Sequence, residues 1–167
     1  MTAQANAELL PIESESIDIV YSSGVLHHTP NTDKAIDEVF RVLKKHGKGV
    51  VGLYSTYSPT FITARIVNTI KSKFIKSNKN WYELTETAWN TKGTSNPWTK
   101  TYSKKELREI FDTSRCNSIH IRSVGFRWAD VLPIIGKYIS KTKVGRITEG
   151  FLRHKLGSMW VVTFEKK

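Results

Sequence analysis

The sequence predicts an α/β fold built around a parallel strand–helix–strand unit near its N-terminus. Residues 17–21 and 50–54 are short, largely apolar runs, which is typical of strands buried in a parallel sheet. Between these runs, apolar residues recur with the spacing of one buried helical face, at Ile36, Val39, Phe40 and Leu43. A helix between two buried strands is the usual crossover of a parallel pair.

The ends of this helix are predicted from capping signals. Residues 31–33, Asn-Thr-Asp, offer three side chains that can cap its N-terminus. Cationic residues 44–46 suit the last turn, and Gly47 is a candidate for the C-cap. Residues 47–49, Gly-Lys-Gly, are then interpreted as the turn into the second strand.

The exit of the first strand is made of small residues, Ser22, Ser23 and Gly24. Small residues at the carboxyl end of a parallel strand let the backbone approach a ligand. We therefore expect a ligand site at this end of the sheet.

The rest of the chain alternates basic helical segments with strands. Residues 58–80 are a candidate basic amphipathic helix, and a capping box at residues 103–106 predicts a helix running to about Thr113. Strands are predicted at 117–124 and 159–164, separated by a basic helical segment at 128–155. In that segment the apolar residues mixed with lysines could form an interfacial helix: Leu132, Ile134, Ile135 and Ile139.

Length, net charge and cysteine content limit the classes of protein to which the chain can belong. The 167 residues suffice for a single domain with its own core, and the formal net charge of +11 predicts attraction to anions. The single cysteine, Cys116, excludes an internal disulfide and is interpreted as a buried residue at a strand start. No apolar run has the length of a membrane span, and no signal-peptide pattern is present.

Three blocks of the N-terminal third resemble the class I S-adenosylmethionine-dependent methyltransferases, in their small-molecule branch. The blocks are Asn-Ala-Glu-Leu-Leu-Pro-Ile at 6–12, Ile-Asp-Ile-Val-Tyr-Ser-Ser-Gly-Val-Leu-His-His at 17–28, and Arg-Val-Leu-Lys-Lys-His-Gly at 41–47. They occur in the order and at the spacing of that family. The strong resemblance covers about residues 5 to 56.

The resemblance implies the second half of a Rossmann-like methyltransferase sheet, followed by an antiparallel edge hairpin that here carries a helical insertion. The family's glycine-rich loop and ribose-binding acid find no counterpart in the sequence. We therefore expect a single partial domain, the C-terminal portion of such an enzyme. Its parts are a cofactor-side unit (1–57), a basic helix, loop and capped helix (58–115), and edge strands with the insertion (116–167).

Site residues follow from the resemblance. Asn6 and Ala7 correspond to the family's adenine-side loop, and Ser22 and Gly24 to the adenosine and methionine side. His28 lies beside the transferred methyl in the family and is the candidate to orient the acceptor or to take its proton. Substrate-pocket candidates are Trp98 and Tyr102. A metal site at the two histidines is not expected, because adjacent side chains diverge and no further ligand stands at suitable spacing.

Three functions remain open from the sequence. The first is methyl transfer from S-adenosylmethionine to a small-molecule or lipid-like acceptor, in a cytoplasmic protein that is peripheral to an anionic membrane surface. The second is a non-catalytic remnant, or a subunit whose open strand edge pairs with a partner chain that completes the sheet. The third is a basic RNA-binding or RNA-modifying protein, which is disfavoured because the cations lie on amphipathic helices and not around aromatic stacking residues. Because half of the family's cofactor site has no counterpart, we expect weak binding of S-adenosylmethionine by this chain.

Overall fold

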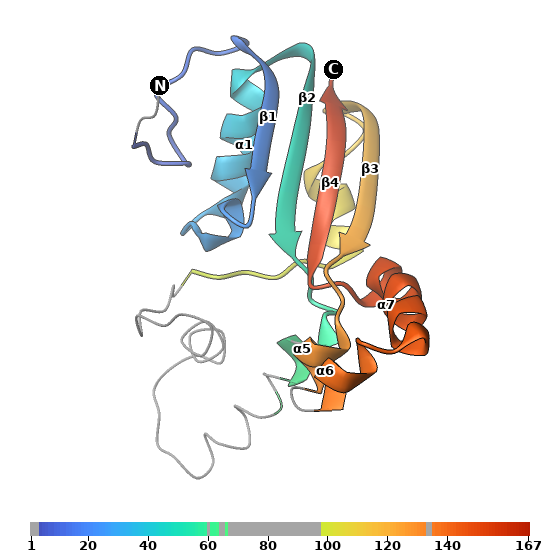
Figure 1. The fold of residues 1–167 in the computed structure, drawn as a ribbon. Helices are drawn as coiled ribbons and strands as arrows, with labels where there is room; N and C mark the ends of the chain where they lie inside the picture. Colours follow the sequence, from blue (N-terminus) through green and yellow to red (C-terminus); the bar gives the residue numbers. More distant parts are fainter. Residues whose placement is uncertain (1–3, 60, 64–65, 67–97, 133–134) are drawn as a thin grey trace, which may run out of the picture. The chain divides into compact units, whose positions relative to one another are not determined.

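The computed structural model describes residues 4–59, 61–63, 66, 98–132 and 135–167, and these form an α/β fold (Figure 1). The elements, in order, are β1 (Ile17–Ser23), the 3-10 helix η1 (Leu26–His28), α1 (Thr32–Val42), β2 (Leu43–Tyr54), α4 (Lys104–Ile110), β3 (Cys116–Val124), α5 (Trp128–Val131), α6 (Ile135–Ile139), α7 (Lys143–Leu156) and β4 (Met159–Lys166). The predicted fold class is confirmed.

The four strands form one mixed sheet in the order β1-β2-β4-β3. β1 and β2 are parallel, with Ser22 opposite Val51 and Ser23 opposite Gly52. β4 runs antiparallel between β2 and β3, as the arrows in Figure 1 show. The antiparallel pair at the sheet edge is thus as predicted, with α5, α6 and α7 inserted between its two strands.

The chain divides into two compact units. The first comprises Met1–Tyr54, Lys100–Arg122 and Trp160–Lys167 and holds α1, α4 and nearly all of the sheet. The second comprises Ser55–Thr99 and Ser123–Met159, and within it α5, α6 and α7 pack on one another. The predicted three-part division of the domain remains a prediction.

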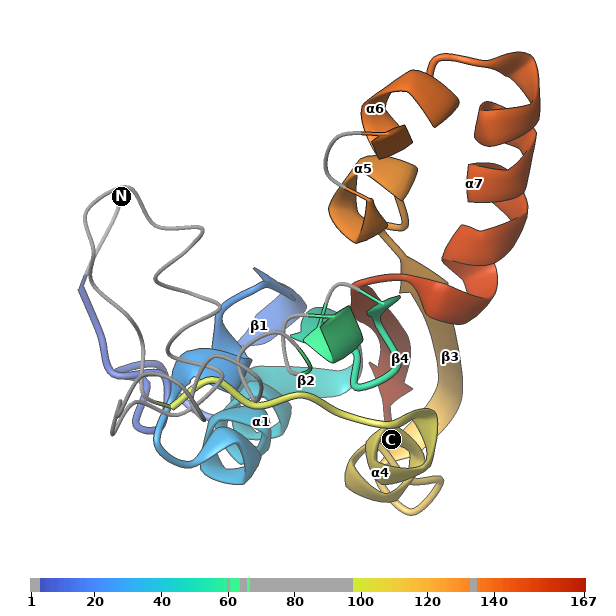
Figure 2. The same cartoon turned by 90° about the horizontal axis from the view of Figure 1, so that it is seen from below.

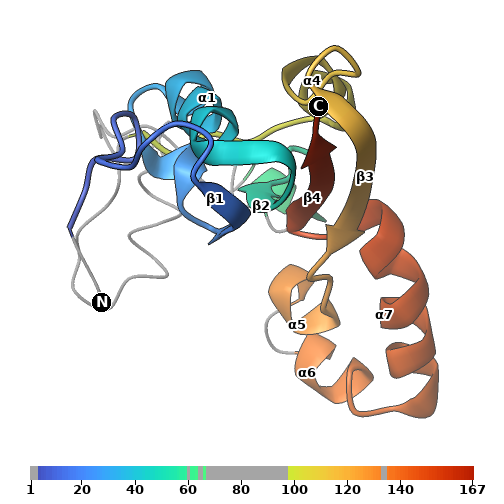
Figure 3. The same cartoon turned by 90° about the horizontal axis from the view of Figure 1, so that it is seen from above.

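The first unit has its core on one face of the sheet. Views along the strands show α1 and α4 on the same side of the sheet (Figures 2 and 3). Between them and the sheet, the rings of Phe40, Phe111 and Phe164 meet with centroids 4.8–5.9 Å apart. Gly49 on β2 leaves room for this cluster, because a Cβ there would run into the Phe164 ring.

The prediction that residues 17–21 are buried on both faces is wrong for alternate positions. Val20 packs against the core, but Ile19 is 67% exposed and Tyr21 is 74% exposed. β1 is also the outermost strand of the described sheet. Only one face of β1 is covered within the described residues, which is why alternate apolar side chains of the strand are exposed.

The predicted helix C-terminus is also wrong. α1 ends at Val42, and residues 44–49 belong to β2 instead of forming a last turn, a Gly47 cap and a tight turn. The final carbonyls of α1 are satisfied from the preceding loop, because the amides of Glu15 and Ser16 donate to Arg41 and Val42 at 2.9 and 3.0 Å. The extra length is absorbed by an irregularity in the register opposite residues 17–19.

The predicted capping box is confirmed. Ser103 Oγ accepts from the Glu106 amide at 3.2 Å, and the Glu106 carboxylate accepts from the Ser103 amide at 2.6 Å. α4 is shorter than predicted and ends at Ile110, and Leu107 and Phe111 are fully buried.

The predictions of basic helices at 58–80 and 128–155 have different outcomes in the structure. Most of the candidate helix at 58–80 lies outside the described residues, although residues 61–63 are helical. The segment at 128–155 is helical as predicted but is broken into α5, α6 and α7. In the proposed interfacial set, Ile135 is 63% exposed and Leu132 is 42% exposed, whereas Ile134 lies outside the described residues.

Cys116 should be chemically silent in the folded protein. It begins β3 and is buried, and burial raises the pKa of its thiol to about 11. Because only the thiolate reacts, we expect no alkylation by iodoacetamide at pH 8 until the chain is unfolded in urea, when one equivalent should react. Mass spectrometry would record both states, and rapid labelling of the native protein would contradict the buried placement.

Candidate functional site at the carboxyl ends of β1 and β2

The carboxyl ends of β1 and β2 lie side by side because the two strands are parallel and in register there. Beyond the last residue pair, the Gly24 amide donates to the Gly52 carbonyl at 3.1 Å. Gly24 adopts φ +72°, a conformation that favours glycine, and a Cβ at this position would meet no atom within 4 Å. The chain therefore turns at Gly24 next to open space, and the predicted ligand site at this strand end stays a prediction.

His27 is the buried centre of this end of the sheet. Its side chain is fully buried, and its ring centroid lies 4.0 Å from that of Tyr54 and 4.1 Å from that of His28. Burial, and then the nearby charge of His28, lower the pKa of His27 to about 3, while the Gly52 backbone opposes the shift. His27 is therefore neutral at physiological pH and cannot serve there as a proton donor from the imidazolium form.

His28, the predicted catalytic residue, is more accessible than His27. It is partly exposed and stands edge-on to Tyr54, with 5.5 Å between the ring centroids. η1 carries both histidines, and the His28 amide closes that turn by donating to the Val25 carbonyl at 3.0 Å. The turn thus places one histidine in the core and the next toward the surface.

Two side chains at the strand end carry buried polar atoms that lack a hydrogen-bond partner among the described residues. These atoms are Ser22 Oγ and the two ring nitrogens of His27, for which the Gly52 backbone is close enough to influence the pKa but does not form a well-aligned hydrogen bond. Buried polar atoms of native proteins are nearly always paired with protein, water or ligand. Both side chains belong to the segment that leaves the carboxyl end of a parallel strand, which is where ligands bind in open α/β sheets.

Residues 100–102, which belong to the first unit, are hydrogen-bonded to this end of the sheet. The Lys100 amide donates to the His27 carbonyl at 3.0 Å, and the Tyr102 amide donates to the Tyr54 carbonyl at 2.8 Å. Tyr102 itself is buried in the core, and its carbonyl accepts from Trp160 Nε1 at 2.9 Å. The structure thus brings Tyr102 to the same end of the sheet as His28.

Trp98, the other predicted substrate residue, belongs to the second unit and is 51% exposed. Its role stays a prediction, as does that of Tyr102.

The predicted adenine-side residues lie on a loop that is tied to α1. Asn6 Oδ1 accepts from the Glu8 amide at 2.9 Å, so the asparagine oxygen already stabilises its own turn. Glu8 Oε1 in turn accepts from the amide of Asn31, the N-cap of α1, at 2.6 Å. Ala7 is partly buried against the core cluster. Asn6 and Ala7 therefore stand on a loop with a fixed place in the first unit.

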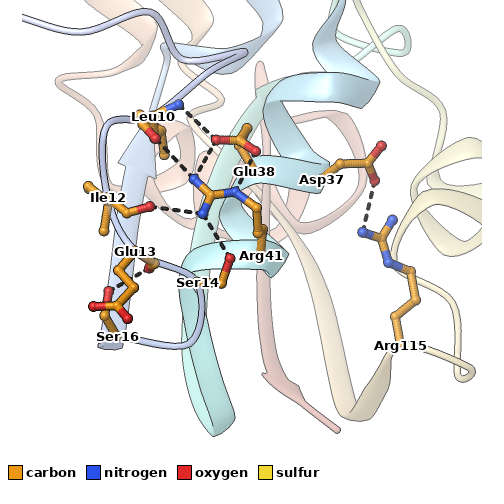
Figure 4. A network of polar contacts seen from close by, with 9 residues as sticks. All are labelled: Leu10, Ile12, Glu13, Ser14, Ser16, Asp37, Glu38, Arg41 and Arg115. Atoms are coloured by element: carbon orange, nitrogen blue, oxygen red, sulfur yellow. Dashed lines mark hydrogen bonds and ion pairs between the residues drawn. The ribbon is translucent and has the colours of Figure 1, made fainter.

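An arginine clamp, which the sequence did not predict, holds the next part of the loop (Figure 4). Arg41 makes a bidentate ion pair with Glu38, at 2.7 and 2.8 Å. Its guanidinium also donates to the carbonyls of Leu10 and Ile12, and Glu38 accepts from the Leu10 amide at 2.7 Å. The i, i+3 spacing of Glu38 and Arg41 on the predicted helix is the sequence signal that could have shown the pair.

The clamp should be sensitive to acid and to loss of Arg41. Hydrogen bonds from Arg41 and Leu10 lower the pKa of Glu38 to about 2. Because this pKa is depressed in the folded state, the clamp is complete above about pH 4.5 and is lost as pH falls toward 2. We expect Arg41→Gln to speed amide exchange of Leu10 at neutral pH by about tenfold, since a charged hydrogen-bond network is lost.

Arg115→Gln is the matched control for this measurement. Arg115 forms an ion pair of 2.9 Å with Asp37, which lies on α1 beside Glu38. Arg115 does not contact the loop that carries Leu10 (Figure 4). Leu10 exchange should be unchanged in this variant. Equal exchange rates in the Arg41 variant and the native protein would show that the clamp does not hold the loop.

No helix in the described ranges combines the length and apolar character needed to cross a membrane. No group of three or more histidine, cysteine or acidic side chains gathers there as a metal site.

The N-terminal third of the chain matches a known protein family. Residues 1–51 match the family described as "Methyltransferase domain". An uncharacterised methyltransferase of Arabidopsis thaliana, described as chloroplastic, is 34% identical over 74 residues. That alignment covers 44% of this chain and 20% of the plant protein, so the chain spans about a fifth of the length of this relative.

Solved structures with a similar fold cover nearly all of the chain. A SAM-dependent methyltransferase of Thermotoga maritima, described as a possible histamine N-methyltransferase, has a TM-score of 0.57 at 16% identity, covering 98% of this chain and 62% of that one. A SAM-dependent methyltransferase of Archaeoglobus fulgidus has a TM-score of 0.53 at 13% identity, covering 99% and 66%. A chain from the complex of a Haloferax volcanii methyltransferase with the Trm112 activator has a TM-score of 0.53 at 14% identity, covering 96% and 59%. Together with the family match, this shared fold confirms the predicted resemblance.

Proposed function

We propose that this chain, which has the fold of the class I S-adenosylmethionine-dependent methyltransferases and their family match over residues 1–51, supplies the methyl-transfer end of such an enzyme's active site. The observation that supports the proposal is the strand end at Gly24, where a Cβ would meet no atom within 4 Å and where the same strand–turn segment carries the buried polar atoms of Ser22 and His27. The chain spans 59–66% of the length of the solved chains named above. Its residues are therefore proposed to form one part of the cofactor site.

The residues present suit one side of S-adenosylmethionine. Ser22 Oγ can donate to or accept from a polar group at the strand end, and Gly24 leaves space for the ligand to approach the backbone. Asn6 and Ala7 would contact the adenine from the loop held by Glu8. The chemistry supplied by bound S-adenosylmethionine is an electrophilic methyl group for transfer to an oxygen, nitrogen or carbon atom.

His28 is proposed as the residue nearest the methyl acceptor. Its partial exposure lets it hydrogen-bond to an acceptor hydroxyl or amine and take a proton from it, whereas buried His27 holds the turn against Tyr54. Trp98 and Tyr102 are proposed to contact the acceptor as well. Most of the rate enhancement would come from orienting the acceptor and excluding water, which needs few chemically active groups.

The acceptor class is proposed to be a small molecule or a lipid-like compound, in a cytoplasmic protein that is peripheral to a membrane. The resemblance to the small-molecule branch of the family supports the first part, and the basic helical segments support the second.

A second candidate function is a non-catalytic subunit that pairs with another chain through β1. The exposed edge of β1, with Ile19 and Tyr21 on its uncovered face, favours this alternative. Such a subunit would leave the strand-end site without a role in ligand binding. RNA binding is a weaker candidate, since its main support is the net charge of +11.

Calorimetric titration with S-adenosylmethionine separates these functions. We expect binding with a dissociation constant above about 10 µM, weaker than roughly −7 kcal/mol, because only part of the site is supplied. Ser22→Ala should weaken binding by about tenfold, through loss of one hydrogen bond. Ser23→Ala is the matched control, since Ser23 is the exposed neighbour on β1 and should leave affinity unchanged.

Each unfavourable outcome has a distinct meaning. No heat of binding at millimolar ligand would favour the non-catalytic subunit. Affinity tighter than 10 µM would contradict the partial site, and equal effects of the two serine variants would place the ligand elsewhere.

A further inference from the structure

The outer face of α7 carries an exposed apolar stripe. Val144, Ile147 and Phe151 follow one another at i, i+3 and i+7, which places them on one side of the helix. They are 71%, 63% and 64% exposed, although residues of this kind are usually buried. Three large apolar side chains are thus aligned in solvent on a single helix.

The inner face of the same helix is already occupied. Gly145 packs against the backbone of α6, because a Cβ there would run into the Ile139 carbonyl. Thr148 Oγ1 accepts from Trp128 Nε1 at 2.9 Å, which ties α7 to α5 (Figures 2 and 3). The stripe is therefore not the face by which α7 packs in its own unit.

The charge around the stripe is strongly positive. Residues 135–156 contain six lysines and arginines and one acidic residue, Glu149. Glu149 is hydrogen-bonded within its own unit, because one of its carboxylate oxygens accepts from the Trp128 amide at 2.8 Å and from Ser140 Oγ at 2.5 Å. Within the described part of the chain, none of the six cations forms an ion pair with a carboxylate: Lys137, Lys141, Lys143, Arg146, Arg153 and Lys155.

Some of these cations stand directly beside the stripe. Lys143 precedes Val144 at the start of α7, and Lys155 Nζ lies 5.1 Å from the ring centroid of Phe151. An ammonium group beside an exposed ring, on a long aliphatic stem, can reach a headgroup while the ring enters the acyl region. The stripe and the cations can therefore contact the same surface together.

We propose that the outer face of α7 docks on an anionic lipid surface, with Val144, Ile147 and Phe151 inserted at the headgroup boundary and Lys143 and Lys155 on the lipid phosphates. The helix has 14 residues, about 21 Å at 1.5 Å per residue, which suits a helix lying in the plane of the interface. The unpaired positive charge complements anionic headgroups, and the aliphatic stripe complements acyl chains.

Nucleic acid fits this surface less well. Binding of single-stranded nucleic acid uses aromatic side chains on which bases stack, and two of the three residues of the stripe are aliphatic. An aliphatic stripe would gain nothing from a phosphate backbone. Lipid explains both features of the surface, whereas nucleic acid explains only the charge.

Docking on lipid is independent of the proposed methyl transfer, because it involves other residues and needs no cofactor. The test is sedimentation of the full chain with sucrose-loaded vesicles, either phosphatidylcholine alone or phosphatidylcholine with phosphatidylserine. At low salt we expect at least tenfold stronger partitioning onto the anionic vesicles, and this preference should fall as salt rises.

Two pairs of variants examine the two parts of the surface. The double variant Ile147→Ser with Phe151→Ser removes apolar contact with the lipid. The double variant Lys143→Gln with Lys155→Gln removes two positive charges, each of which should contribute about fivefold to the affinity for anionic vesicles. Both pairs should weaken partitioning tenfold or more. Because all four residues are exposed or at the helix end, circular dichroism and the melting temperature should stay as in the native chain.

Matched controls are taken from the first unit. Ile19→Ser removes an equally exposed apolar side chain from the β1 edge, and Lys104→Gln with Arg108→Gln removes two exposed charges from α4. Neither control should change partitioning more than twofold.

Three outcomes would overturn the proposal. One is equal partitioning onto neutral and anionic vesicles. Another is loss of binding in the controls as large as in the α7 variants. The third is a poly(U) gel shift that is stronger than vesicle binding and survives Ile147→Ser with Phe151→Ser, which would assign the surface to nucleic acid.

Discussion

Replacing Phe164 with alanine should lower the free energy of unfolding by about 3–5 kcal/mol, the usual cost of deleting a buried phenylalanine ring. Phe164 on β4 is 2% exposed, and its ring contacts both Phe40 and Phe111. It also fills the space that Gly49 leaves on β2. One ring thus joins two strands to α1 and to the residue that follows α4, so its removal leaves a cavity that no single neighbour can fill.

Urea unfolding at neutral pH, followed by circular dichroism, measures this effect. Phe151→Ala is the matched control, because Phe151 is exposed and should change stability by less than about 0.5 kcal/mol. Gly49→Ala should also be strongly destabilising, since its new methyl group would run into the Phe164 ring. If Phe164→Ala cost no more than Phe151→Ala, the three-ring core would be wrong.

Protonation of His27 should make the fold sensitive to mild acid. The pKa of His27 is about 3 in the folded chain and about 6.5 when the chain is unfolded. Since the pKa is lower in the folded state, the contribution of neutral His27 to the free energy of unfolding is complete above pH 6.5. This contribution is lost as pH falls from 6.5 toward 3. At pH 5 the loss through this one residue should be about 2 kcal/mol.

His27→Phe removes the titrating group and keeps a ring against Tyr54. Between pH 7 and pH 5, the free energy of unfolding of the variant should fall by about 2 kcal/mol less than that of the native chain. Urea unfolding at both pH values measures this difference. At pH 7 it should fold at least as stably, because it removes two buried nitrogens that lack partners. His120→Gln, at an exposed histidine on β3, should retain the native acid response. Identical acid responses of His27→Phe and the native chain would contradict the buried, neutral histidine.

Local patterns predicted the elements that local chemistry specifies. The capping box of α4 lies within four residues, and the apolar period of α1 and the short apolar runs of β1 and β2 are likewise continuous in sequence. Where a neighbour distant in the chain decides the structure, the predictions were wrong. α1 ends early because the amides of Glu15 and Ser16 cap its carbonyls, which no capping residue in the helix itself indicates.

The candidate site divides in the same way. Ser22, Gly24 and His28 lie on one continuous strand–turn segment, so a family-like motif was enough to indicate them. The Arg41 clamp joins residues about 30 positions apart and was found only in the structure. The apolar stripe of α7 was also missed, because an i, i+3, i+7 pattern in sequence is equally typical of a buried face.

Methyl transfer at the carboxyl ends of β1 and β2 is most directly tested by mapping where the cofactor's product binds. In an amide NMR titration with S-adenosylhomocysteine, we expect saturable shifts at Ser22, Gly24 and His28 and on the loop that carries Asn6 and Ala7. Shifts confined to α5–α7, or no shifts at millimolar ligand, would contradict a cofactor site at this end of the sheet.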